Sequence, residues 1–381
     1  IDGRAQPSFA PLSRFWRAAD GWVRTHGNYP HHRDRLLRAL GVDPGLADPV
    51  PAVERLIAET PAERVEDLVN AAGGLAVAVR DPDAWARHPH GERVAALPLL
   101  RLTRTDDAPP RPLGPLPDGP VLPMAGVRVL DLTRVIAGPV GTRTLALLGA
   151  DVLRIDSPRL SEIPAQHTET GAGKRSTLLD LAGPADRATF EDLLAAADVV
   201  VTGYRPGALD RYGLSPAALA ERRPGLVVAS LSAWGTVGPW AERRGFDSLV
   251  QAASGIAVAE GSPESPGALP VQALDHGTGY LLAAAVMRAL TLGATGWHAE
   301  LSLAQTAAAL LALPAQARET AEFDPSGYLA EAGPVRYALP PVDLAGGPRT
   351  WAHPATPWGS DAPAWRQRES GSGGLGDPVR R

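Results

Sequence analysis

The chain has 381 residues, 44% of them hydrophobic, and a net charge of −5, which is the composition of a globular protein of about two domains. The negative charge gives no reason to expect nucleic acid or an anionic membrane as a partner, and no apolar run is long enough to predict a membrane span. The absence of cysteine excludes disulfides and thiolate chemistry and fits a reducing cytoplasm. The nine histidines show no metal-ligand spacing, so we expect a cytoplasmic protein without a metal.

The first 104 residues predict a small α+β domain. Apolar residues recur at helical spacing over 33–41 and 53–74, and both stretches end in glycine, which commonly terminates helices. The run LAVAVR, residues 75–80, predicts a strand. Residues 105–123 are dense in proline and lack apolar periodicity, so they predict an extended linker at a domain boundary.

A different pattern, in which strands alternate with helices, covers residues 124–322. It predicts right-handed βαβ units in an α/β domain with a parallel, Rossmann-like sheet and flanking helices. Ligands bind such sheets at the carboxyl ends of the strands. Beyond it, residues 323–381 are expected to form an extended segment with a disordered tail. The predicted strands are 127–132, 151–156, 175–181, 198–204, 225–235 and 298–303, and a long helix begins near Asp275.

The stretch GAGKRSTLLDL, residues 171–181, contains the only lysine of the chain, Lys174. It approaches the phosphate-loop pattern GxxxxGK[ST], but Thr168 replaces the first glycine and Arg175 replaces the hydroxyl residue that binds magnesium. An ATP-type loop is therefore not expected. Lys174 and Arg175 could still bind a phosphate of another kind, and the alternative is a solvated turn with two ordinary surface charges.

Seven sequence blocks, in unbroken order over about residues 125–311, resemble the family III CoA-transferases, also called the CaiB/BaiF family. This family includes formyl-CoA transferase, carnitine CoA-transferase and α-methylacyl-CoA racemase. The blocks are GVRVLDLTRVIAGPVGTRTLALLGADVLRID, GKRSTLLDL, DVVVTGYRPGALDRYGL, SLSAWGTVGPW, GFDSLVQAASG, LDHGTGY and GWHAELSL.

The order of the domains departs from the family pattern. PSFAPLSRFWRAADGWVRTHGN, followed by RLLRALG, is similar to the family's small domain, which in ordinary members follows the large domain. Here it comes first, so we expect a tandem or permuted architecture with a further large-domain half upstream of Ile1. Because members of the family interlock as dimers, the resemblance implies a homodimer or a single-chain tandem pseudo-dimer.

The resemblance implies transfer of CoA between carboxylic acids through an aspartate, and Asp275 matches that nucleophile. A carboxylate can attack a thioester to give an anhydride, which CoA thiolate reopens to an enzyme thioester. From the residues alone, Asp275 begins a long helix whose N-terminus would keep it ionised, and an ordinary N-cap is the alternative. Gly277 and Gly279 would allow a thioester to approach closely or would ease helix packing.

Coenzyme A is the expected co-substrate, and its phosphates and adenine require cations and an apolar slot. Tyr204 and Tyr212 could flank the base, while Arg211 and Arg244 could pair with phosphate. Lys174 and Arg175 are further candidates for a CoA phosphate. The positions that match the family's CoA contacts are Val135, Leu179, Gly203, Tyr204, Arg211, Tyr212 and Arg244.

Departures from the family pattern bear on the activity. Ile136 stands where formyl-CoA transferase has glutamine, which argues against a small polar diacid such as oxalate as substrate. Phe246 stands where the racemase has its proton-shuttling histidine, and we interpret His276 as structural, so an acyl-CoA racemase or isomerase is the weaker alternative. No counterpart of the glycine-rich loop that shields the anhydride is found. The reversed domain order leaves a non-catalytic CoA-binding half of a tandem or heteromeric transferase as a further alternative.

Overall fold

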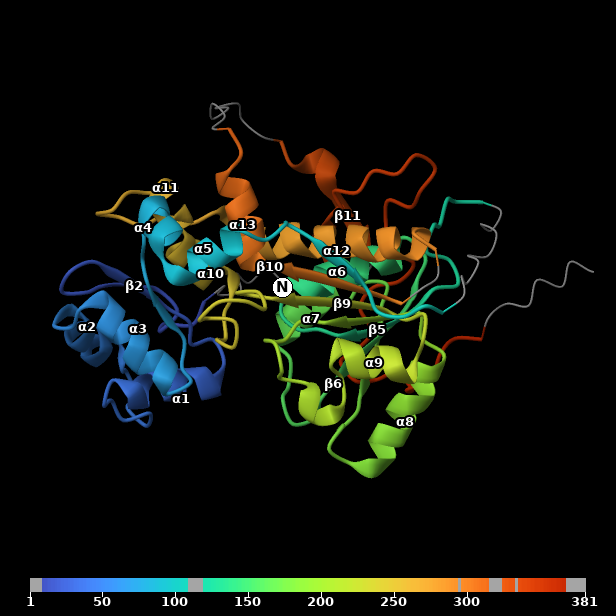
Figure 1. Ribbon diagram of the computed structural model, residues 1–381, viewed down its shortest axis with the longest axis horizontal. Coiled ribbons are helices and arrows are strands. Elements are labelled where there is room, and N and C mark those ends of the chain that lie inside the picture. The colour runs from blue at the N-terminus through green and yellow to red at the C-terminus, as the bar shows by residue number, and fades with distance from the viewer. Residues whose placement is uncertain (1–8, 109–118, 294–295, 315–323, 333–334, 368–381) are drawn as a thin grey trace, which may run out of the picture.

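The small unit at the start of the chain is an antiparallel sheet covered by helices. This computed structural model describes residues 9–108, 119–293, 296–314, 324–332 and 335–367, and Figure 1 shows the small unit in blue beside a larger α/β unit. Apolar side chains of both layers, such as Trp16, Val23, Leu36 and Val65, form one buried core. The strands, in sheet order, are β1 (Phe15–Arg17), β2 (Trp22–Thr25) and β3 (Ala76–Ala78), and the helices are α1 (Pro30–Ala39), α2 (Val50–Ala58) and α3 (Ala62–Ala71).

The boundary between the two units lies earlier than the predicted residue 104. Helices α4 (Pro82–Arg87) and α5 (Pro89–Ala95) contribute Trp85 and Val94 to the core of the large unit. Strand β4 (Arg101–Arg104) pairs antiparallel with β10 (Trp297–Ser302) as an edge of the large sheet. The boundary lies earlier because Trp85 packs on Trp240 of the large unit, with ring centroids 5.5 Å apart, and buries its apolar side chain there. Much of the predicted linker, and the predicted disordered tail, lie outside the described residues.

The large unit contains the predicted parallel sheet, which is confirmed. Its seven strands run in the order β4-β10-β9-β8-β5-β6-β7, and all except β4 are parallel. Along the chain, β5, β6 and β7 lie successively further out on one side of the sheet, and β8, β9 and β10 lie successively further out on the other. The strand order therefore reverses between β5 and β8, which is where doubly wound sheets bind ligands. The parallel strands are β5 (Arg128–Leu132), β6 (Asp151–Asp156), β7 (Arg175–Leu178), β8 (Val199–Thr202), β9 (Val227–Ser232) and β10.

Helices cover both faces of this sheet because its side chains alternate between two apolar cores. Val129, Val199 and Val227 face one core, and the neighbouring Leu130, Val200 and Val228 face the other. The first core includes α6 (Ala137–Leu147), α10 (Asp247–Ser254), α11 (Ile256–Ala259), α12 (Ala273–Thr291) and α13 (Leu303–Leu311). The second includes α8 (Pro184–Ala195) and α9 (Pro216–Arg222), which Figure 1 shows on the opposite side of the sheet from α12.

The remaining described elements are short. Helix α7 (Pro164–Thr170) precedes β7, and a single 3₁₀ turn, η1 (Asp210–Tyr212), follows β8. Helices α10 and α11 are separated at Gly255, whose φ of +94° ends α10. Two further 3₁₀ turns are η2 (Pro270–Gln272) and η3 (Ser326–Tyr328). In the described part of the chain, no helix is both long enough and apolar enough to cross a bilayer.

The described residues after β12 return to the large sheet, following a small antiparallel pair of β11 (Leu329–Ala332) and β12 (Val335–Ala338). Asp361 exchanges two hydrogen bonds of 2.8 Å with the backbone of Ser176 in β7. Trp365 donates its indole N–H to the Leu193 carbonyl at 3.0 Å. The described part of the predicted extended segment therefore covers the β7 edge of the sheet.

Glycine allows α6 and α12 to cross closely beneath the candidate site. A Cβ on Gly279 would lie 2.5 Å from the Ala137 carbonyl oxygen, and one on Gly141 would lie 2.6 Å from Leu282. Both distances are below van der Waals contact, so only glycine fits there. Gly277, two residues earlier on α12, has no such neighbour, because its Cβ would meet only Thr306 at 3.8 Å.

We predict that Gly279→Ala lowers the free energy of unfolding by about 2 kcal/mol, because the new methyl group must push α12 away from the α6 backbone. Gly277→Ala is the matched control, and it should leave stability unchanged or raise it by up to about 1 kcal/mol through helix propensity. Urea unfolding of both variants measures the difference. Equal stabilities would contradict the close helix crossing.

Candidate active site

A cavity of about 630 Å³ opens at the carboxyl ends of the parallel strands. Its wall includes the last residue of a strand, or the residue that follows one, from five strands in turn: Leu132, Asp156, Leu179, Gly203 and Ser232. The small unit closes one side with Tyr29, His31 and His32. The cavity therefore lies at the reversal of strand order, between the two units.

Asp275 lines this cavity from the first turn of α12. Its side chain is buried, and among the described residues no hydrogen bond or ion pair reaches its carboxylate. Burial, together with the charge of Asp247, raises the pKa of Asp275 well above its ordinary value. This differs from the expectation that the helix N-terminus keeps the carboxylate ionised, because desolvation has the larger effect.

The N-terminus of α12 is capped by Asp247, at the start of α10. The backbone N–H of Asp275 donates to Asp247 Oδ2 at 2.9 Å, and the N–H of Leu274 also bonds this carboxylate. Gln251 donates its side-chain amide to Asp247 Oδ1. Because Asp247 satisfies the helix end, the carboxylate of Asp275 is not needed as a cap.

The backbone before α12 is strained. Val271 and Gln272 have φ values of +50° and +58°, although neither is a glycine. Such conformations cost about 1–3 kcal/mol each and persist where the surrounding structure imposes them. They turn the chain directly into the helix that carries Asp275. The sequence gives no local signal for this turn or for the cap, since Asp247 lies 28 positions before Asp275.

All seven positions that match the family's CoA contacts line the same cavity as Asp275. Val135 stands in the turn between β5 and α6 with a φ of +72°, a conformation that a β-branched residue rarely adopts. Ala137, the first residue of α6, also lines the wall, so the positive end of that helix faces the cavity. The structure thus brings together Val135, Leu179, Gly203, Tyr204, Arg211, Tyr212 and Arg244.

The charged residues of the cavity wall divide into paired and unpaired groups. Among the described residues, no carboxylate pairs with Arg205, Arg211 or Arg244, and no cation pairs with Asp275. The lining arginines that are neutralised by carboxylates are Arg134 with Glu162 (3.3 Å), Arg159 with Asp180 (2.6 Å) and Arg243 with Glu66 (3.0 Å), and Asp156 pairs with Arg154 at 2.7 Å. The cavity therefore presents one free carboxylate and a surplus of free guanidinium groups.

Aromatic residues of the small unit surround Phe246. The imidazole of His26 stacks on the Phe246 ring with centroids 3.8 Å apart, and the rings of His32 and Tyr29 lie at 5.9 and 6.4 Å. Phe246 and Ile136 line the same cavity as Asp275, so part of its wall is apolar. His276 is absent from that wall; its structural role stays a prediction.

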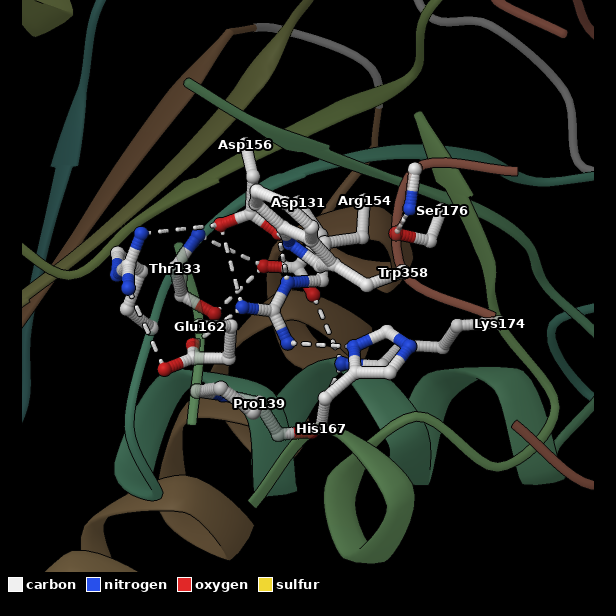
Figure 2. Close-up of polar contacts among 12 residues, drawn as sticks. Asp131, Thr133, Pro139, Arg154, Asp156, Glu162, His167, Lys174, Ser176 and Trp358 are labelled. Carbon is white, nitrogen blue, oxygen red and sulfur yellow. Dashed lines mark hydrogen bonds and ion pairs between the residues drawn. The ribbon is translucent and has the colours of Figure 1, made fainter. Parts of the chain in front are cut away.

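Lys174 lies in the interior and away from the cavity wall, which corrects its expected place at a CoA phosphate. Its ammonium group donates to Asp131 Oδ2 at 2.9 Å and to the Thr142 hydroxyl at 3.0 Å, and only 2% of the residue is exposed (Figure 2). Asp131 lies within β5 and is fully buried, so its charge requires a buried cation. The alternative of a solvated surface turn is equally excluded for Lys174.

Arg175 is also absent from the cavity wall. It begins β7, whereas the cavity lies at the other ends of the strands. Its guanidinium group pairs with Asp151 at 2.8 Å and donates to the Ala364 carbonyl of the returning C-terminal segment. Arg175 therefore fastens that segment to the sheet edge.

Figure 2 also shows a buried ion network that the sequence did not predict. Arg154 pairs with Asp156 at 2.7 Å and with Glu162 at 2.5 Å, and Trp358 donates to Asp156 at 2.9 Å. Glu162 accepts a hydrogen bond of 3.4 Å from the Tyr29 hydroxyl. The network thus connects the strand floor of the cavity to the small unit. In the described part of the chain, no three histidine or acidic side chains are placed to hold a metal.

We predict that Lys174→Ala lowers the free energy of unfolding by about 3–5 kcal/mol, because it leaves Asp131 buried without a partner. The double variant Asp131→Leu/Lys174→Met should recover most of this loss, since it removes both charges. Denaturant titration measures both. A Lys174→Ala variant of unchanged stability and weakened CoA affinity would restore the phosphate-site interpretation.

Comparisons with known proteins identify CoA-transferases among the relatives of this chain. An acyl-CoA transferase of Gibberella moniliformis is 31% identical over 70% of this chain and 50% of its own length. The acetyl-CoA:oxalate CoA-transferase of Acetobacter aceti is 35% identical over 42% of each chain, and the succinate–glutarate CoA-transferase of Agrobacterium fabrum is 31% identical over 50% and 53%. A crystal structure of a hypothetical protein from Mycobacterium tuberculosis, 34% identical, superposes with a TM-score of 0.48 over 51% of this chain and 57% of that one.

The chain spans about half the length of the curated relatives it matches. The sequence profile of CoA-transferase family III matches residues 124–344, which are more than half of this chain. The chain therefore belongs to CoA-transferase family III.

Proposed function

We propose that this protein transfers CoA from an acyl-CoA thioester to a carboxylic acid, with Asp275 as the nucleophile. The observation that carries the proposal is the state of Asp275, a buried carboxylate that opens into the cavity and has no ionic partner among the described residues. Other carboxylates of the wall, Asp156 and Asp180, are held by arginines and are poor nucleophiles.

The reaction proceeds through three covalent intermediates on Asp275, which are two acyl anhydrides and the aspartyl-CoA thioester between them. Its carboxylate attacks the thioester carbonyl, and CoA thiolate leaves as a mixed anhydride forms. The thiolate attacks the aspartyl carbonyl, which releases the donor carboxylate and leaves an aspartyl-CoA thioester. The acceptor carboxylate attacks this thioester and releases thiolate again. Finally the thiolate attacks the acyl carbonyl of the second anhydride, which forms the product acyl-CoA and regenerates Asp275.

The surroundings of Asp275 suit this chemistry. A desolvated carboxylate with a raised pKa is a better nucleophile than a hydrated one, provided that it is ionised at the working pH. The apolar side chains of Phe246 and Ile136 limit water near the anhydride, which water would hydrolyse. The cap supplied by Asp247 fixes the first turn of α12 without using the carboxylate of Asp275.

We assign the nucleotide part of CoA to the cavity wall at the ends of β5, β7 and β8. Tyr204 and Tyr212 flank the adenine, and the unpaired Arg211 and Arg244 meet phosphate oxygens. The positive N-terminus of α6 adds a favourable field for the same anionic groups. Val135, Leu179 and Gly203 complete the wall, while the placement of Lys174 and Arg175 removes both from the CoA site.

The α-proton chemistry of a racemase has less support. It requires a second proton-transfer group beside Asp275, and the position of that group is occupied by Phe246. His32 lies next to Phe246, but burial, the neighbouring His31 and two arginines lower its pKa to about 3, so its imidazole is a weak base. We further propose that the working assembly is a cytoplasmic homodimer or a tandem pseudo-dimer, as the resemblance to CoA-transferase family III implies.

We predict that Asp275→Asn abolishes transfer and stabilises the protein at pH 7. The pKa of Asp275 is raised on folding, so its ionisation costs stability at every pH above its unfolded value. Asparagine removes that cost, and the gain should shrink as the pH falls toward about 4, where unfolded aspartate protonates. A CoA-exchange assay with thermal unfolding at several pH values tests both parts. Retained transfer would refute the nucleophile, and it would favour a non-catalytic role for Asp275.

We predict that the rate of acyl transfer falls as the pH is lowered through the raised pKa of Asp275, because only the ionised carboxylate attacks. In Asp247→Asn, the neighbouring negative charge is lost while an oxygen remains to cap α12. The acid limb of the kcat/KM profile should then move to lower pH by about 1 unit. An unmoved limb would mean that another group controls the reaction.

A further inference from the structure

Two of the unpaired arginines of the cavity lie together with a third arginine of the small unit. Burial and the charges of Arg205 and Arg35 lower the pKa of Arg244. Arg35, on α1, and Arg244 place guanidinium nitrogens 3.5 and 3.7 Å from the point that a Cβ on Gly73 would occupy, so the two groups are neighbours. Among the described residues, no carboxylate pairs with any of the three. Like charges held together without a counter-charge favour the binding of an anion.

Two histidines of the small unit extend this arginine cluster into the cavity. His31 and His32 both line the wall, with ring centroids 4.0 Å apart. His32 is 6% exposed, and its Nδ1 is buried without a hydrogen-bond partner. Burial and the nearby arginines lower the pKa of His31, so both imidazoles are neutral and can donate one N–H each.

The cluster joins groups from both units at one place. His31, His32 and Arg35 come from α1, whereas Arg205 follows β8 and Arg244 precedes Phe246. Arg35 is absent from the cavity wall itself; its guanidinium group donates a hydrogen bond of 3.2 Å to the Gly73 carbonyl and places its positive charge beside Arg244. The large unit alone therefore supplies only two of the five side chains.

We propose that His31, His32, Arg205 and Arg244 form an anion-binding subsite on the cavity wall, to which Arg35 adds positive charge from beside Arg244 and which the small unit completes in the same chain. Its ligand is an anionic oxygen group of a substrate: the phosphate of CoA that we assigned to Arg244 or, if Arg211 alone meets that phosphate, a carboxylate of the acceptor. Guanidinium groups bind both through charge-assisted hydrogen bonds, and the neutral imidazoles add donors without further repulsion. The identity of the ligand rests on the proposed transferase function, while the existence of the subsite does not.

The test compares Arg35→Gln with Arg38→Gln in the full chain. Both residues lie on α1 and both changes remove one positive charge, but Arg38 is exposed at the last turn of the helix. Glutamine keeps a donor for the Gly73 carbonyl, and unfolding midpoints verify that both variants are folded. Calorimetric titration then measures the dissociation constants of CoA and, separately, of succinate. His31→Ala provides a second variant that removes a donor without changing the charge.

We expect Arg35→Gln and His31→Ala to weaken the binding of one of the two probes by about tenfold or more, and Arg38→Gln to leave both unchanged. A loss confined to CoA identifies a phosphate ligand, and a loss confined to succinate identifies a carboxylate ligand. Affinities that change less than about twofold for both probes would overturn the subsite. Because no turnover is required, this result stands apart from any failure of Asp275 to act as nucleophile.

Discussion

The carboxylate of Asp247 is the interaction on which the candidate active site depends. It accepts the backbone N–H groups of Leu274 and Asp275 and so caps the N-terminus of α12 without help from the side chain of Asp275. Asp275 can then occupy the first helical turn with its own carboxylate free. Burial and the proximity of the two carboxylates raise the pKa of Asp275. One contact thus sets both the position and the chemical state of the proposed nucleophile.

Paired and unpaired charges occupy different parts of this fold. Beneath the cavity, Asp131 with Lys174, and Arg154 with Asp156 and Glu162, are buried and mutually neutralised. Such pairs fix the geometry of the strand ends, since breaking one leaves a buried charge. On the cavity wall, the free carboxylate of Asp275 and the free guanidinium groups of Arg211 and Arg244 are uncompensated. These are the charged groups that remain free to bind a substrate.

Much of the large unit could be predicted from the sequence because its signals are local. The alternation of apolar runs and helices from β5 to β9 predicts a parallel sheet, and the resemblance of seven consecutive blocks identified the family. The same resemblance pointed to Asp275 and to seven wall residues, including Val135 and Arg244, which the structure places around one cavity. Strands β1 and β2 were missed because they are short and carry charged residues, such as Arg17 and Arg24.

The errors arose where the decisive contact is distant in the sequence. Lys174 looked like a phosphate ligand because its buried partner, Asp131, lies 43 positions earlier on another strand. The cap from Asp247, the edge strand β4 and the histidines of α1 are likewise defined only once the chain has folded. In each case the residue type was ordinary, and its role came from the neighbour that tertiary packing supplied.

The most direct test of the account is to trap the covalent intermediate on Asp275. The protein is incubated with an acyl-CoA and then with hydroxylamine, and the peptide that contains Asp275 is examined by mass spectrometry. The account predicts a hydroxamate at Asp275 that depends on acyl-CoA and is absent from Asp275→Asn. CoA exchange without any modification of Asp275, or no adduct and no exchange at all, would contradict it.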